Sequence, residues 1–152
     1  MPEIVRTDSS NPDFIALVKL LDEELAIRDG AEHSFFAQFN QIDSIRHVVV
    51  AYADGEPVGC GAFKRYDVVT AEIKRMFVRS EARGRRIGAD VLTELEAWAI
   101  EEGFSAAILE TGFKQPEAIR LYERSGYDRI PNYGQYAGVE SSVCMKKSLI
   151  SD

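Results

Sequence analysis

The sequence predicts an α/β domain built on a mixed central sheet of about seven strands with flanking helices. Three observations lead to this class: short runs of β-branched and aromatic residues recur along the chain, helical patterns separate several of them, and one pair of runs meets at Asp54-Gly55. A tight turn joins antiparallel strands, whereas a helix between two strands joins parallel ones, so we expect a mixed sheet. Because no linker or internal repeat divides the 152 residues, we expect residues 1–152 to form a single domain.

The first half of the chain predicts a strand, a helix and a hairpin. Residues 3–7 form a short strand-like run, and Asn11-Pro12 then opens a helix in which apolar residues recur with helical spacing. Residues 27–40 are expected to form a loop that includes a short second helix. Residues 47–67 predict a β-hairpin, because strand-like runs flank the Asp54-Gly55 dipeptide, which is typical of two-residue turns.

The second half of the chain predicts a strand, a crossover helix and a parallel strand, followed by another helix and two strands. Gly103 and Gly126 each follow a helical pattern, as is typical of helix C-termini, and Pro116 opens the second helix. The predicted order is therefore β-α-(α)-β-β-β-α-β-α-β-β, with a right-handed crossover. The expected strands cover residues 70–78, 105–110, 127–130 and 141–149, and the expected helices cover residues 84–102 and 115–125.

Composition and charge argue against several classes of function. The formal net charge of -7 disfavours nucleic-acid binding, which depends on a positive surface. No run approaches the ~18 apolar residues of a membrane span, and the N-terminus lacks a signal-peptide pattern, so we expect a cytoplasmic protein with no membrane partner. The 2 histidines and 2 cysteines lack metal-ligand spacing, so we expect no metal site, and we expect Cys60 and Cys144 to be buried free thiols.

A turn rich in glycine and arginine, VRSEARGRRIG, joins the strand at 70–78 to the helix at 84–102. Residues 74 to 86 contain 6 of the 18 lysine and arginine side chains. A helix N-terminus has unpaired N–H groups and a partial positive charge, Gly84 allows unusual dihedral angles, and arginine adds bidentate phosphate contacts. The turn therefore predicts a diphosphate cradle. The spacing from Gly84 to Gly88 fits neither a Walker loop nor a dinucleotide fingerprint, and turn chemistry with close helix packing is the structural alternative.

These residues resemble the GNAT superfamily of acetyl-CoA-dependent N-acyltransferases. VRSEARGRRIG is similar to its pyrophosphate motif, with Arg83 and Gly88 at the first and last positions and Arg86 where the family has a glycine. AEIKRMFV is similar to the family's fourth strand, and KQPEAIRLYERSGY to its second coenzyme motif. The resemblance covers nearly the whole chain, most closely residues 70–127. It is close to a group of small bacterial members whose chains end in a similar IPNYGxY…SVCM.

The resemblance implies a site for acetyl-CoA or coenzyme A. In the family the fourth strand splays away from the fifth, and its free backbone groups pair with the pantetheine arm like an added strand. Met76 and Val78 are expected to present these groups, and Gln115 stands where the family often has a coenzyme-contacting asparagine. The implied coenzyme-binding residues are Met76, Phe77, Val78, Arg83, Gly84, Arg85, Arg86, Ile87, Gly88, Ala89, Gln115 and Tyr122.

The resemblance also implies catalytic residues. Tyr122 lies where the family has the tyrosine that protonates the departing thiolate, although helical spacing alone also fits a core aromatic residue. Glu72 resembles the catalytic glutamate of the histone acetyltransferase branch, and strand alternation is expected to put residues 72, 74, 76 and 78 on one face. A surface or salt-bridged glutamate and a water chain are the alternatives for this base, and Glu110 is a further candidate. The Met76 N–H is the expected oxyanion donor.

A small-molecule or peptide amine is the expected acceptor, bound across the sheet edge from the coenzyme. The walls of this pocket correspond to residues 22–36 and 131–138, where acidic side chains suit a cationic amine, although charge runs are usually solvated helix faces. The function implied is direct acetyl transfer from acetyl-CoA in a ternary complex. A catalytically idle acyl-CoA-binding or regulatory module and a nucleotide-phosphate-binding protein are the alternatives, and exposed strand edges are compatible with a homodimer. The candidate acceptor-site residues are Asp22, Glu23, Glu24, Asp29, His33, Tyr133 and Tyr136.

Overall fold

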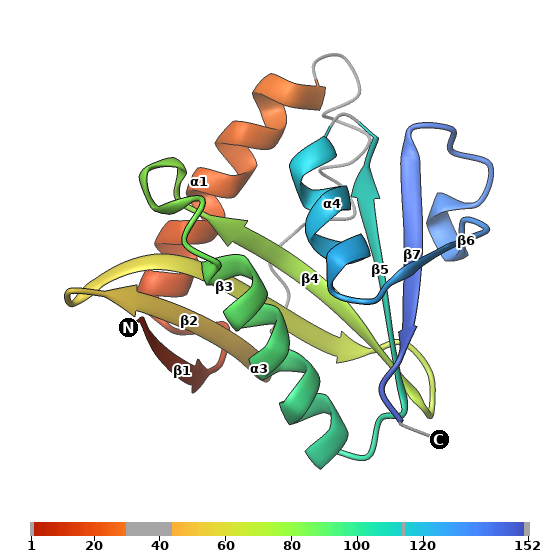
Figure 1. Ribbon diagram of the computed structural model, residues 1–152, viewed down its shortest axis with the longest axis horizontal. Helices are drawn as coiled ribbons and strands as arrows, with labels where there is room; N and C mark the ends of the chain where they lie inside the picture. The colour runs from red at the N-terminus through yellow and green to blue at the C-terminus, as the bar shows by residue number, and fades with distance from the viewer. Residues whose placement is uncertain (1, 30–43, 114, 151–152) are drawn as a thin grey trace.

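The computed structural model describes residues 2–29, 44–113 and 115–150, which form one open sheet with helices on both faces (Figure 1). The sheet has seven strands in the order β1-β2-β3-β4-β5-β7-β6. β4 and β5 are parallel and the other neighbouring pairs are antiparallel, which confirms the predicted mixed sheet. The elements are β1 (Glu3–Thr7), α1 (Pro12–Asp29), β2 (His47–Ala53), β3 (Glu56–Arg65), β4 (Thr70–Val78), η2 (Ser80–Ala82), α3 (Ile87–Glu101), β5 (Ala106–Gly112), α4 (Pro116–Arg124), β6 (Asp128–Ile130), η3 (Gly134–Tyr136) and β7 (Ser142–Ser148).

The predicted order of elements is confirmed over these residues, with shifts at several element boundaries, of which two bear on the site. α1 continues to Asp29, so residues 27–29 are helical, and the rest of the expected loop and second helix lies outside the described residues. α3 begins at Ile87 rather than at residue 84, because Gly84 and Arg86 take left-handed backbone conformations that a right-handed helix excludes. In the part of the chain that the structure describes, no helix is long and apolar enough to cross a bilayer.

Short-range signals explain where α1 begins and how β2 turns into β3. The Asn11 Oδ1 accepts hydrogen bonds from the backbone N–H groups of Asp13 at 2.8 Å and Phe14 at 3.1 Å, and so caps the helix. At the β2–β3 turn, Asp54 and Gly55 have φ angles of 52° and 81°. Two consecutive left-handed residues are the backbone signature of a two-residue hairpin turn, as the dipeptide predicts.

Helices cover both faces of the sheet, which explains the unbroken apolar run of β2. Val49 belongs to a buried cluster with Val91 and Leu95 of α3, whereas Val48 belongs to a second cluster with Phe14 of α1. A strand buried on both faces needs no polar side chains at alternate positions. α3 and α4 therefore pack on one face and α1 on the other (Figure 1).

β4 and β5 diverge toward their C-terminal ends, and α4 lies over the opening (Figure 1). Their ladder joins only residues 70–72 to residues 106–108, although β4 continues to Val78 and β5 to Gly112. Beyond Glu72, the β5-facing edge of β4 has no ladder partner among the described residues. Such an edge can pair with the backbone-like amides of an extended ligand.

Candidate active site

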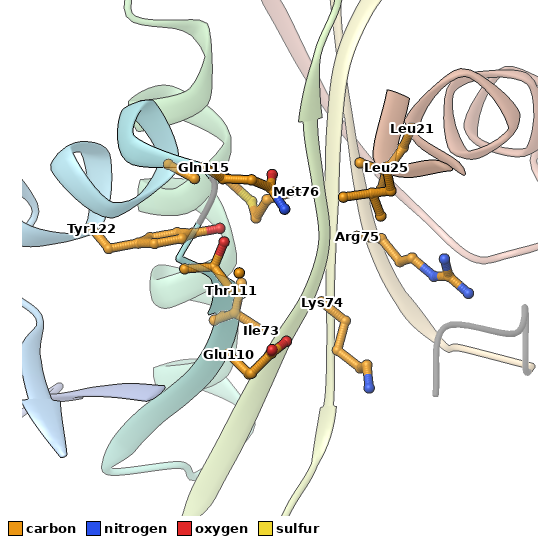
Figure 2. A pocket seen from close by; sticks show the side chains of 12 residues that line it. Leu21, Leu25, Ile73, Lys74, Arg75, Met76, Glu110, Thr111, Gln115 and Tyr122 are labelled. Atoms are coloured by element: carbon orange, nitrogen blue, oxygen red, sulfur yellow. The ribbon is translucent and has the colours of Figure 1, made fainter. Parts of the chain in front are cut away.

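A cavity of about 90 Å³ occupies the opening between β4 and β5. In Figure 2, Gln115 and Tyr122 approach it from the α4 side, and Leu21 and Leu25 approach it from the α1 side. The cavity therefore runs through the gap in the sheet and has walls on both faces. The residues that line it are Leu21, Leu25, Ile73, Lys74, Arg75, Met76, Glu110, Thr111, Gly112, Gln115, Ala118 and Tyr122.

A β-bulge at Arg75 changes which side chains of β4 face the cavity from each side. Between the register pairs Ala62↔Lys74 and Cys60↔Phe77, β4 has one residue more than β3, and Arg75 has a φ of 60°. An extra residue shifts the phase of side-chain alternation. Met76 therefore packs with the α3-side cluster that also holds Ile73, and Phe77 packs with the α1-side cluster. The expectation that residues 72, 74, 76 and 78 share one face is wrong for this reason.

Tyr122 is placed by α4 so that its side chain lines the cavity together with Met76 and Gln115 (Figure 2). The side chain is 6% exposed, and its hydroxyl makes no hydrogen bond with a described residue. Burial and the negative charge of Glu110 raise the pKa of Tyr122 above its ordinary value. The phenol is therefore protonated at neutral pH and able to donate its proton to a leaving group in the cavity.

The two candidate carboxylates lie in different surroundings. Glu110 of β5 lines the cavity with Tyr122. Glu72 of β4 is 6% exposed and lies outside the lining; its Oε2 accepts a hydrogen bond from the Tyr133 hydroxyl at 2.8 Å, and its Oε1 is 3.9 Å from the Lys74 Nζ. The structure thus brings Glu110 into the same cavity as Tyr122 and ties Glu72 to the β6–β7 loop.

The turn between β4 and α3 has the backbone conformation expected of an anion cradle. Gly84 has a φ of 84°, and Arg86, at the N-terminal boundary of α3, has a φ of 64°. Arg86 therefore takes a left-handed conformation, which glycine adopts more readily than arginine. No side chain of the described residues caps α3, so the first-turn N–H groups from Ile87 onward remain available to an anion.

Gly88 and Arg83 also have structural roles in this turn. A Cβ on Gly88 would lie 3.2 Å from the Leu121 Cδ2, so this glycine allows α3 and α4 to approach closely. Close helix packing is the role that the sequence offered for this glycine as an alternative to anion binding. The Arg83 Nε donates a hydrogen bond to the Val78 carbonyl at 2.9 Å, and its Nη2 forms an ion pair with Glu24 at 2.7 Å. Arg83 therefore links the turn to α1.

Acidic residues of α1, which were expected to attract a cationic amine, are partly engaged by arginines of the protein. Asp22 lies 3.4 Å from the Arg75 Nη1, and Glu24 pairs with Arg83. These carboxylates therefore neutralise the β4 and turn arginines in the free protein. His33 lies outside the described residues.

The expected aromatic wall on the β6–β7 loop lies next to Glu72. The ring of Tyr133 packs edge-to-face on Tyr66, with centroids 5.0 Å apart, and on Tyr136 at 5.6 Å. Burial is the main cause, and the charge of Glu72 the second, that raises the pKa of Tyr133. Its hydroxyl therefore stays protonated and donates a hydrogen bond to Glu72. The sequence carries no local signal for this contact, because it joins residues 61 positions apart.

Comparison with known proteins defines the class to which this fold and site belong. A Klebsiella pneumoniae protein assigned as an acyl-CoA N-acyltransferase has a crystal structure that matches this chain with a TM-score of 0.84 and 30% identity, covering 99% of each chain. An IAA acetyltransferase of Azospirillum brasilense is 35% identical over 150 residues, 96% of this chain and 97% of its own. An aminoalkylphosphonate N-acetyltransferase of Salmonella typhimurium is 31% identical over 129 residues, 80% of each chain.

The model of the Acetyltransferase (GNAT) family matches residues 14–127. The chain therefore belongs to the GNAT family, as its turn and element order indicate. It is an acetyltransferase, and acetyl-CoA is the co-substrate that membership of this family supports.

Proposed function

We propose that the protein transfers an acetyl group from acetyl-CoA to a primary amine by direct attack in a ternary complex. The observation that carries this proposal is the cavity through the sheet, which is lined by Tyr122 on its α4 side and by Leu21 and Leu25 on its α1 side. The coenzyme enters from the α4 side with its diphosphate at residues 83–89, and the amine enters from the α1 side. An aminoalkylphosphonate N-acetyltransferase among the relatives supports an amine acceptor.

Each reacting group then has a protein partner. The pantetheine arm pairs with the unpaired edge of β4, along Met76 to Val78, and the Met76 N–H stabilises the developing oxyanion. The amine nitrogen bonds to the acetyl carbon, the carbon–sulfur bond breaks, and Tyr122 protonates the departing thiolate. Glu110, which lines the cavity, and Glu72, which is held by Tyr133, are the two candidates for the base that receives the amine proton.

Direct transfer fits the state of the two cysteines better than a covalent acyl-enzyme does. Cys60 and Cys144 are both buried. Burial raises the pKa of Cys60 to about 12 and also raises that of Cys144, so neither thiol ionises readily at neutral pH. Neither cysteine lines the cavity.

Calorimetric titration with acetyl-CoA, with ATP as the control ligand, tests the coenzyme site. Gly84→Asp puts a negative charge in the cradle, and Gly84→Asn is the uncharged control of similar shape. Both substitutions carry the same backbone strain at a φ of 84° and have open space around the Cβ, so the two variants differ mainly in charge. We expect Gly84→Asp to abolish binding and Gly84→Asn to retain it; equal affinity in both would reject the cradle. Binding without amine-dependent thiol release would instead indicate the catalytically idle module.

A further inference from the structure

Lys74 is a buried cation that the proposed mechanism does not use. Its side chain is 11% exposed and lines the cavity. The nearest carboxylate oxygen of a described residue, the Glu72 Oε1, is 3.9 Å from the Lys74 Nζ, which is beyond hydrogen-bond distance. Among the described residues, the Lys74 ammonium makes no hydrogen bond. Within the described part of the chain, the charged end of a lining side chain therefore has no acceptor at hydrogen-bond distance.

A buried cation without a hydrogen-bond acceptor is costly, and an anion bound in the cavity would relieve that cost. Burial, with the nearby charges of Lys64 and Arg75, lowers the pKa of Lys74 below its ordinary value, and the charges of Glu72 and Glu110 offset this only in part. The other cation in the lining, Arg75, already faces Asp22 at 3.4 Å. Lys74 is therefore the better placed of the two cations to bind a ligand.

Glu110 lies on the opposite wall of the same cavity, on β5. Figure 2 shows its carboxylate directed toward β4, whereas the Lys74 ammonium lies on the α1 side of β4. Lys74 and Glu110 thus line the proposed entry path of the acceptor, and Leu21 and Leu25 of α1 form the opposite, apolar side of this path. Lys74 is two positions before Met76, and a strand rises about 3.3 Å per residue, so the backbone positions of these two residues are at most roughly 7 Å apart. This arrangement matches a short molecule with an ammonium and an anion.

We propose that the acceptor is a small zwitterion, an amine that also carries a carboxylate or a phosphonate, whose anionic group binds Lys74 while its amine faces Glu110. This inference rests on the proposed acetyl transfer. The ammonium gives one proton to Glu110, the free amine forms the nitrogen–carbon bond, and the carbon–sulfur bond breaks. Tyr122 gives its proton to the thiolate and regains one from the acylated nitrogen. The product no longer has a positive charge to pair with Glu110, which favours its release.

The experiment uses matched acceptors and matched variants of the full chain. The acceptors are glycine and glycinamide, β-alanine and β-alaninamide, and aminomethylphosphonate, each assayed for thiol release from acetyl-CoA. We expect kcat/KM for the acids to exceed that for the amides by at least about 10-fold, as for loss of a charge-assisted hydrogen bond. The carboxylate and phosphonate arms show which anion the site prefers.

Lys74→Met keeps the length of the side chain and removes its charge. We expect it to lower kcat/KM for the acids by about 10- to 100-fold, through KM, and to leave the amides unchanged. Lys146→Met is the control, because Lys146 is an exposed lysine of β7 outside the cavity lining. Unchanged acetyl-CoA affinity of Lys74→Met by calorimetry shows that the variant is folded, and Lys74→Arg should restore part of the preference for acids.

Two results would overturn the inference separately from the proposed function. Acetylation of acids and amides at equal rates would reject the zwitterion, and so would equal losses for both in Lys74→Met, which is what a purely structural role beside Glu72 would produce. Absence of both acetyl-CoA binding and thiol release would reject the proposed function, and the inference with it.

Discussion

Replacing Tyr122 by phenylalanine should separate catalysis from stability. The Tyr122 hydroxyl faces the cavity without a hydrogen bond to a described residue, and its ring packs on Tyr127 at 5.9 Å. Phenylalanine keeps this packing, so we expect the free energy of unfolding to change by no more than ~0.5 kcal/mol. Loss of a general acid costs about 10²- to 10⁴-fold in rate. At 1.36 kcal/mol per factor of ten, the barrier rises by about 2.7 to 5.4 kcal/mol.

Tyr127→Phe is the matched control, because it removes the same atom from the neighbouring ring. The Tyr127 hydroxyl donates a hydrogen bond to the Glu96 Oε2 at 2.8 Å, and Tyr127 does not line the cavity. A hydrogen bond to a charged group contributes about 1.5–3 kcal/mol, so this variant should be destabilised by about that amount and retain kcat. Tyr122→Phe should therefore lose turnover and keep its stability, whereas Tyr127→Phe should lose stability and keep its turnover.

The assay combines thiol release at saturating acetyl-CoA and amine with denaturant-induced unfolding of each variant. Because burial and Glu110 raise the pKa of Tyr122, ionisation of this phenol should not reduce kcat of the wild type until the pH exceeds about 10. Wild-type turnover by Tyr122→Phe would refute the acid role. Equal loss of turnover in Tyr127→Phe would show that packing, and not proton transfer, controls the rate.

Three further predictions concern packing, pH and the base. A Cβ at Gly61 would lie 2.5 Å from the Met76 Sδ, so Gly61→Ala should lower the free energy of unfolding by about 1–3 kcal/mol; an unchanged denaturation midpoint would contradict this. Burial raises the pKa of tyrosines such as Tyr133, so above pH ~10 the folded state keeps protons that the unfolded state loses. The free energy of unfolding should therefore hold below pH ~10 and fall above it by up to ~1.4 kcal/mol per pH unit per tyrosine. A free energy of unfolding that stays constant at alkaline pH would contradict this. Glu110→Gln should reduce kcat more than Glu72→Gln, because only Glu110 lines the cavity; the reverse order, measured across the pH–rate profile, would return the base to Glu72.

Much of the fold could be predicted because its signals act over a few residues. The Asn11 cap satisfies N–H groups two and three positions away, and Asp54-Gly55 supplies the backbone angles of its own turn. The position of the turn between β4 and α3 could be predicted for the same reason. Gly84 supplies a left-handed residue three positions before Ile87, the start of α3, where unpaired N–H groups are unavoidable.

The bulge of β4 could not be predicted in this way. Arginine does not favour a φ of 60°, so nothing at Arg75 marks the irregularity in the sequence. The register of β4 against β3 produces it, and it moves Met76 to the face opposite the one that simple alternation predicts. The side chains on each side of the cavity follow from this one extra residue.

The sequence by itself determined the family, the order of the elements and the position of the turn from β4 to α3. It also placed Tyr122 on a helix that begins at Pro116. Only the tertiary structure decided that Glu110 and Lys74 share the cavity with Tyr122 and that Tyr133 binds Glu72. The physical reason is that backbone preferences and caps depend on neighbours in the chain, whereas the surroundings of a side chain depend on strand register and packing between residues far apart in sequence.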